Sequence, residues 1–245
     1  MGGLWGSFAN VCIYRLPQDK GVVAGRSYCP KCKTQISWYD NIPIFSYLFI
    51  QGKCRKCKKQ ISIQYLLVEF LSILSFVAAY FFYGITVTTL LFIILALAFI
   101  IIFFIDLKHY IIPNSLTFPL MFIGFVKSFD PNLNELFPNY INSLIGGVFG
   151  YGIIWAIIFI YKILRNKEGM GLGDAKLLSA IGFWFGWIAI PFIMFLSSVI
   201  ALISVVPSLL KNSKTMSSQI PFGPYIILGT LVYLFFENSF KSLVF

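Results

Sequence analysis

The feature that most constrains this sequence is a succession of long apolar stretches with almost no charged residues inside them. A helix needs about 20 apolar residues to cross ~30 Å of hydrocarbon, and several stretches reach that length. Hydrophobic residues make up 58% of the chain and charged residues only 11%, unlike a soluble globular domain. The sequence therefore predicts an all-α polytopic membrane protein with about seven to eight transmembrane helices. The stretches lie at 65–83, 87–105, 115–128, 140–163, 177–190, 191–210 and 221–237.

Positive charge divides the chain into regions and predicts their orientation. Residues 1–14 are too short to span a bilayer alone, and we expect them to form a partial or short first transmembrane segment. Residues 15–64 hold ten Lys and Arg against two Asp, which predicts a cytoplasmic domain by the positive-inside tendency. Residues 65–245 would then form the transmembrane domain. The net charge of +10 also suits a nucleic-acid binder, but 27 Phe and the apolar runs argue against nucleic acid as a partner.

The basic segment contains two CxxC pairs, Cys29 with Cys32 and Cys54 with Cys57. Four thiolates at this spacing satisfy tetrahedral Zn²⁺, so a small structural zinc-knuckle domain is expected near the N-terminus. The alternative is two disulfides, which a reducing cytoplasmic face disfavours. Cys12 remains as a small packing residue in an apolar run.

Two carboxylates are predicted at one membrane depth on the cytoplasmic side. Asp106 directly follows the run 87–105, and Asp174 follows Gly171 and Gly173 ahead of the run 177–190. A charge at the membrane edge is costly unless it is paired or used, which points to function. The alternative is that each is a solvated residue at a helix end, with Asp174 as an N-cap.

Two neighbouring carboxyl groups that share one proton can hydrolyse an amide. The ionised group activates water, and the protonated group donates to the scissile bond. Asp106 is expected at the C-terminal end of the helix 87–105, and Asp174 at the N-terminal end of a helix that begins near Ala175. The helix dipoles, with Lys176, then favour Asp174 as the base and Asp106 as the acid. The alternatives are a transporter or scaffold that uses the aspartates for ion or proton relay, and a methyltransferase without protease activity.

Several motifs together resemble the bacterial type IV prepilin peptidase family. They are the run Gly6–Pro17, the two cysteine pairs, Asp106 with Pro113 and Asn114, Gly171–Lys176, and Pro221–Pro224. The resemblance covers nearly the whole chain. Its GxGD signature, at Gly171–Asp174, is similar to that of presenilin-like proteases.

The resemblance implies a membrane aspartic endopeptidase of the bacterial inner membrane, with its active site facing the cytoplasm. Such enzymes remove the leader of type IV prepilins and pseudopilins, and many then methylate the new N-terminal amine with S-adenosylmethionine. It also implies Asp106 and Asp174 as catalytic residues, supported by Gly171, Gly173, Lys176, Pro113 and Asn114. Many relatives have aspartate where this chain has Asn114, which we expect to cap the following helix together with Ser115.

The resemblance also implies a basic leader, which suggests how the substrate is bound. A basic leader and the basic segment 15–64 would repel each other, so we expect that segment to lie on anionic lipid headgroups of the bilayer. The leader would instead meet carboxylates, and the candidates are Asp40, Glu69 and Glu168.

Overall fold

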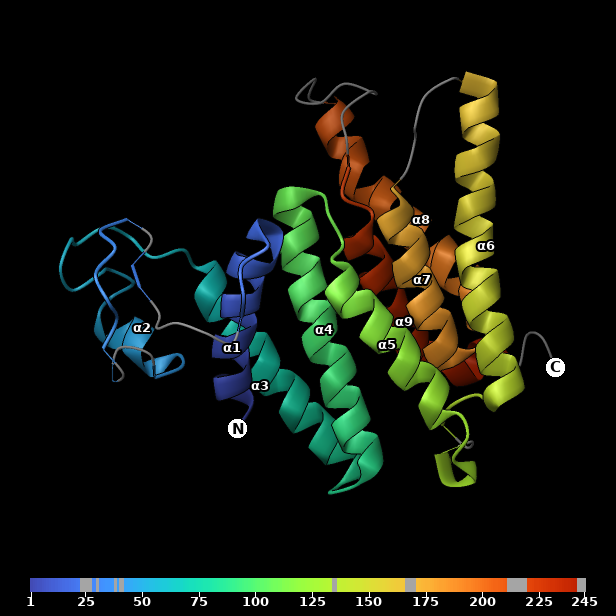
Figure 1. Cartoon of the computed structure of the whole chain (residues 1–245), viewed down its shortest axis with the longest axis horizontal. Coiled ribbons are helices and arrows are strands. Elements are labelled where there is room, and N and C mark those ends of the chain that lie inside the picture. The colour runs from blue at the N-terminus through green and yellow to red at the C-terminus, as the bar shows by residue number, and fades with distance from the viewer. Residues whose placement is uncertain are drawn as a thin grey trace. The chain divides into compact units, whose positions relative to one another are not determined.

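A computed structural model gives the fold. It describes residues 1–22, 28–29, 31–37, 39, 42–133, 136–165, 171–210 and 220–241. Over these residues the regular structure is helical, apart from two isolated β-bridges, which confirms the all-α fold class (Figure 1). The chain divides into two compact units, residues 1–105 and 106–245.

Four of the described helices are long and apolar enough to cross a membrane. The fold is thus that of a polytopic membrane protein, while the number of spans, seven to eight, stays a prediction. The four are α3 (Gln64–Tyr83), α4 (Val87–His109), α6 (Tyr140–Arg165) and α8 (Ala189–Leu210). The shorter helices are α1 (Gly2–Arg15), α2 (Phe45–Phe49), α5 (Asn114–Lys127), α7 (Leu172–Phe185) and α9 (Gly223–Lys241).

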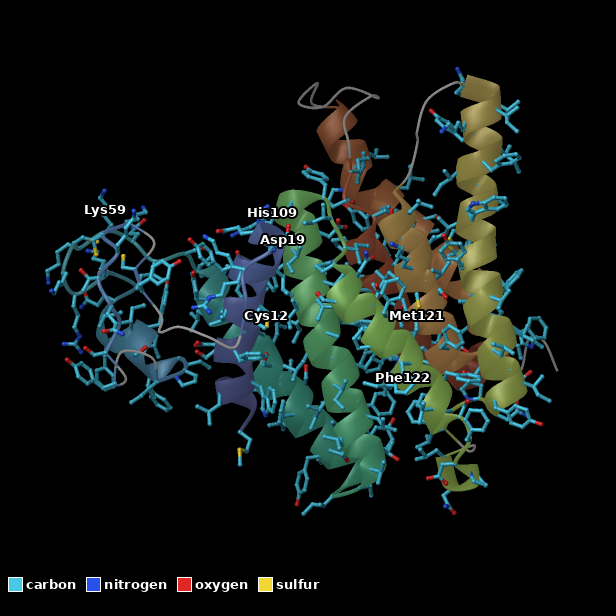
Figure 2. All side chains as sticks on the ribbon, viewed as in Figure 1. Cys12, Asp19, Lys59, His109, Met121 and Phe122 are labelled. Carbon is cyan, nitrogen blue, oxygen red and sulfur yellow. The ribbon has the colours of Figure 1, made fainter. Side chains whose placement is uncertain are left out.

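Three helix boundaries differ from the sequence prediction. Helix α4 continues past 105 to His109, which Figure 2 marks at the end of its ribbon, so Asp106 lies inside its last turn. Helix α7 begins at Leu172 and stops before Gly186, whose φ of 81° ends the helix. Helix α8 begins ahead of Pro191, because proline is tolerated in a first turn, where no earlier carbonyl needs its N–H.

In the first unit, α1 packs on α3 through small residues. A Cβ on Gly6 would lie 2.7 Å from the Glu69 Cα, so only glycine allows this approach. Further along the same contact, Asn10 Nδ2 donates to the Tyr65 carbonyl at 3.1 Å. Cys12 is buried in α1, as expected of a small packing residue.

In the second unit, α6 and α7 pack through glycines. A Cβ on Gly150 would lie 2.7 Å from the Leu178 carbonyl oxygen, and Gly146 and Gly182 meet backbone to backbone. Ser179 Oγ donates to the Gly147 carbonyl at 2.8 Å across the same contact. Small residues that bring helix backbones together are typical of membrane packing, where lipid supplies no hydrophobic drive between helices.

Helix α7 is also tied to α5 near both of its ends. Near its start, Lys176 Nζ donates to Asn114 Oδ1 at 2.8 Å. Near its end, Trp184 Nε1 donates to the Leu120 carbonyl at 2.8 Å, and buried Lys127 Nζ donates to the Trp184 carbonyl at 3.1 Å. These bonds fix the position of α7 along the axis of α5. They therefore also fix the position of Asp174, which lies in the first turn of α7.

Candidate active site and metal centre

Asp106 is held by the first residue of another helix. Its side chain is only 4% exposed, and its Oδ2 accepts the N–H of Gly223, the first residue of α9, at 3.0 Å. A Cβ at position 223 would lie 2.7 Å from that same oxygen. Glycine is therefore required for α9 to begin against the carboxyl group of Asp106.

Asp174 lies in the first turn of α7. Gly171 is the N-cap, and Asp174 is the third residue of the helix, so the alternative of Asp174 as an N-cap is wrong. Its side chain is 8% exposed, and the charge of Asp106 acts on its carboxyl group. The structure thus brings the two aspartates together from α4 and α7.

Ile112 packs against the glycine next to Asp174 and against the glycine that binds Asp106. A Cβ on Gly173, beside Asp174, would lie 3.1 Å from Ile112 Cβ, and a Cβ on Gly223 would lie 3.1 Å from Ile112 Cδ1. At Gly171 the nearest atom would be 3.8 Å away, an ordinary contact. Of the two glycines of the signature, Gly173 is therefore the tightly packed one.

The four paired cysteines form one cluster in the first unit. Their Sγ atoms all lie within 4.8 Å of one another, with Cys29 and Cys57 at 3.9 Å and Cys32 and Cys54 at 4.0 Å. All four are free thiols, so the disulfide alternative is wrong for this structure. Tetrahedral ligands at ~2.3 Å from a metal lie about 3.8 Å apart, so the cluster fits a four-thiolate metal site.

Local hydrogen bonds favour the thiolate form of two of the four cysteines, Cys32 and Cys54. The side chain and backbone of Thr34 lower the pKa of Cys32 to about 6. The backbone N–H groups of Cys57 and Lys56 lower the pKa of Cys54. Because the thiolate is the form that binds metals, these bonds prepare Cys32 and Cys54 for a cation. Burial and the bonds from the neighbouring cysteines instead raise the pKa of Cys57 to about 11.

Comparison with known proteins finds two family matches, one in the region of the cysteine cluster and one in the region of the two aspartates. The bacterial peptidase A24 N-terminal domain matches residues 1–83, and the type IV leader peptidase family matches residues 90–206. This chain belongs to the type IV leader peptidase family. The first match includes the four cysteines and the second includes both aspartates. No solved structure matches the chain significantly.

Relatives named prepilin leader peptidase/N-methyltransferase are similar over nearly their whole length. The protein of Aeromonas hydrophila is 35% identical over 96% of this chain and 88% of its own. That of Vibrio cholerae serotype O1 is 36% identical over 94% and 92%, and that of Pseudomonas aeruginosa is 33% identical over 98% and 89%.

Two supporting residues of the family motifs have a different role from the one expected. Pro113, not Asn114, is the N-cap of α5, so the prediction that Asn114 caps this helix is wrong. Asn114 is the first helical residue, and its side-chain oxygen is occupied by Lys176. The ammonium group of Lys176 also lies 5.6 Å from the ring centre of Phe118. Lys176 therefore links α7 to α5.

The helix that begins at Gly223 changes the electrostatic comparison of the two aspartates. From the sequence, the only helix end expected at Asp106 is the C-terminal end of the helix 87–105. The structure adds the N-terminal end of α9, whose N–H stabilises negative charge on Asp106, as the start of α7 does on Asp174. Both carboxyl groups thus face a helix N-terminus, and the choice of Asp174 as base stays a prediction with less support.

Two features of the site escaped the sequence analysis. In the sequence Gly223 stands out only as part of a family motif, although glycine between prolines ahead of an apolar run marks a helix start. The cysteine pairs also belong to a short repeat, Cys29–Ser37 and Cys54–Ser62, offset by 54 − 29 = 25 positions. In both copies the backbone closes in the same way, with φ of 57° at Lys33 and at Lys58.

Of the three carboxylates predicted to bind the leader, Glu69 lies in the described residues. Its Oε2 accepts the N–H of Ile44 at 2.8 Å, so it already holds a backbone segment next to α3. Asp40 and Glu168 lie outside the described residues.

We predict that Gly223→Ala lowers the rate of cleavage by about 10-fold to 100-fold, because the new methyl group displaces Asp106. The rate is measured on a prepilin with purified protein. Gly152→Ala is the matched control, since a Cβ there meets nothing within 4 Å. Equal activity of the two variants would show that the bond from Gly223 to Asp106 does not position the site.

Proposed function

We propose that this protein removes the leader peptide of type IV prepilins and pseudopilins and then methylates the new N-terminal amine. The observation that carries this proposal is the pair of buried aspartates, brought together from α4 and α7, within the region that matches the leader peptidase family. The relatives carry both activities in their names.

Asp106 and Asp174 are the catalytic pair in this proposal. Two close carboxyl groups with little access to water hold one proton between them. The ionised member removes a proton from the attacking water, and the protonated member donates to the scissile peptide. Gly173 and Gly223 both lie against Ile112, which helps to position the two groups. Lys176 and Asn114 hold α7 against α5, whose N-cap is Pro113.

The protein is a multi-pass protein of the bacterial inner membrane, and we propose that its active site faces the cytoplasm. The strongly basic segment 15–64 supports this orientation, because cytoplasmic loops are enriched in Lys and Arg. Lys108 and His109, two and three residues after Asp106, end α4, which supports the same side for the catalytic pair.

The proposed cofactors are Zn²⁺, in a structural role, and S-adenosylmethionine, as the methyl donor. Four thiolates close the coordination shell of zinc and leave no position for a reacting water, so this metal supports folding of the segment. The second candidate function, ion or proton relay, has no comparable support, since the matching family is one of peptidases.

We predict that Asp106→Asn and Asp174→Asn each lower cleavage at least ~100-fold, because each removes an acid or base from the pair. Methylation of a peptide that already lacks its leader should persist. Both are read from the mass of the product N-terminus. Asp19→Asn is the control, being exposed and in a left-handed conformation, φ 52°, that asparagine adopts readily. Retained cleavage in either site variant would refute the aspartic mechanism.

We predict about one zinc ion per chain in freshly purified protein, bound by the four cysteines. Replacing Cys32 and Cys54 by Ser should remove the metal, and the melting temperature should fall. Metal content is measured by mass spectrometry, and Cys12→Ser, buried away from the cluster, is the control. Full metal content in the double variant would place the metal elsewhere.

We predict that Glu69→Gln raises KM for a basic-leader prepilin by about twofold to fivefold, with kcat unchanged. The amide of Gln keeps an acceptor for the Ile44 N–H and loses only the negative charge. The variant therefore tests the contact with the leader while the structural hydrogen bond is kept. Asp130→Asn is the control, because Asp130 follows the end of α5 that is opposite to Asn114, and the amide keeps an acceptor for the Asn132 N–H. An unchanged KM, measured at low salt, would exclude Glu69 as a leader contact.

A further inference from the structure

Helix α2 has an apolar face that no other described residue covers. Phe45, Leu48 and Phe49 are 64%, 61% and 83% exposed. Tyr47, on the opposite face, donates its hydroxyl to the Ile61 carbonyl at 3.3 Å and so packs against the rest of the cysteine segment. Three large side chains exposed on one face indicate an interaction surface.

The start of α2 lies beside the second and third turns of α3, not beside its first residue. The N–H of Ile44, the N-cap of α2, is bound by Glu69. A Cβ on Gly3 would lie 2.9 Å from Pro43 Cβ and 3.4 Å from Ile73 Cδ1, so Pro43 reaches the level of Ile73. At 1.5 Å per residue, Glu69 and Ile73 lie ~8 Å and ~14 Å along α3 from its first residue.

These depths fall inside the hydrocarbon if α3 spans the bilayer. Helix α3 has 20 residues and is therefore ~30 Å long, which equals the thickness of the hydrocarbon. Its first turn must then lie at the membrane surface, and α2 begins below that level. In the view of Figure 1, α2 lies at the height of the middle of α1 and not above its C-terminal end.

Much of the backbone around α2 has the hydrogen bonds that such a position requires. Within hydrocarbon, each N–H needs a partner in the protein. Glu69 satisfies the donor at the helix start, and carbonyl groups of the same segment satisfy the next ones. The bonded N–H groups are those of Ile44, Phe45, Ser46, Leu48 and Ile50.

Positive charges lie where lipid headgroups would be. The second cysteine pair is surrounded by exposed cations, which are Lys53, Arg55, Lys56, Lys58 and Lys59. Figure 2 shows Lys59 away from α2, toward the end of the unit where Asp19 lies. The cysteine segment thus has an apolar face on α2 and cations away from it. These two surfaces suit the acyl chains and the anionic headgroups of one membrane leaflet.

We propose that α2 inserts into the membrane leaflet beside α3, with Phe45, Leu48 and Phe49 among the acyl chains and the cations of the second cysteine pair on anionic headgroups. This goes beyond contact of the basic segment with the lipid surface. The insertion anchors the four-cysteine cluster to the bilayer independently of catalysis.

The test places a photoreactive benzoylphenylalanine at Phe49 in the full-length protein, reconstituted in nanodiscs of phosphatidylglycerol and phosphatidylcholine. After irradiation, mass spectrometry should find acyl chains attached to the peptide that contains position 49. The same residue placed at Lys59 is the matched control, and its lipid adducts should be at least fivefold fewer.

The outcomes separate the possible occupants of the α2 face. A covalent dimer linked through position 49 would assign this face to a second copy of the chain and overturn the proposal. Equal lipid adducts at positions 49 and 59 would also overturn it. Replacing phosphatidylglycerol by phosphatidylcholine should lower the yield at position 49, and an unchanged yield would remove the role assigned to the cations.

Discussion

The burial of two carboxyl groups in an apolar protein is the constraint on which the rest of the structure depends. Neither Asp106 nor Asp174 has a described cation as its partner, so each relies on backbone groups at the start of a helix. Burial without a counter-ion makes it unfavourable for both groups to be charged together. The burial that makes two charges unfavourable therefore also makes the pair suitable for sharing one proton.

Glycine makes this arrangement possible, because each aspartate must meet another helix closely. At Gly223 the backbone itself binds Asp106, and at Gly173 the chain passes against Ile112 next to Asp174. Glycine also allows close helix packing elsewhere in the second unit, where Gly146 and Gly182 bring the backbones of α6 and α7 into contact. Helix α7 is thus fixed by close packing along its length and by hydrogen bonds near both of its ends.

The sequence predicted the helical membrane fold, the cysteine cluster and the two aspartates, because each depends on a local pattern. An apolar run, a CxxC pair and an acid at the edge of a run are all visible in one stretch of chain. It did not predict that α7 begins at Leu172 or that Asn114 binds Lys176. Those features depend on contacts between residues up to 62 positions apart, which no local pattern records.

The role of Glu69 shows why residue type alone assigns function poorly in such a protein. A carboxylate on a membrane helix suggests a ligand for a basic peptide, and it also suggests a partner for a backbone group that lacks water. In this structure Glu69 binds the N–H that precedes α2, in the second turn of a helix just long enough to cross the bilayer. The acid that appears free for substrate in the sequence is thus already part of the way the cysteine segment is attached to α3, and any leader contact must share its second oxygen.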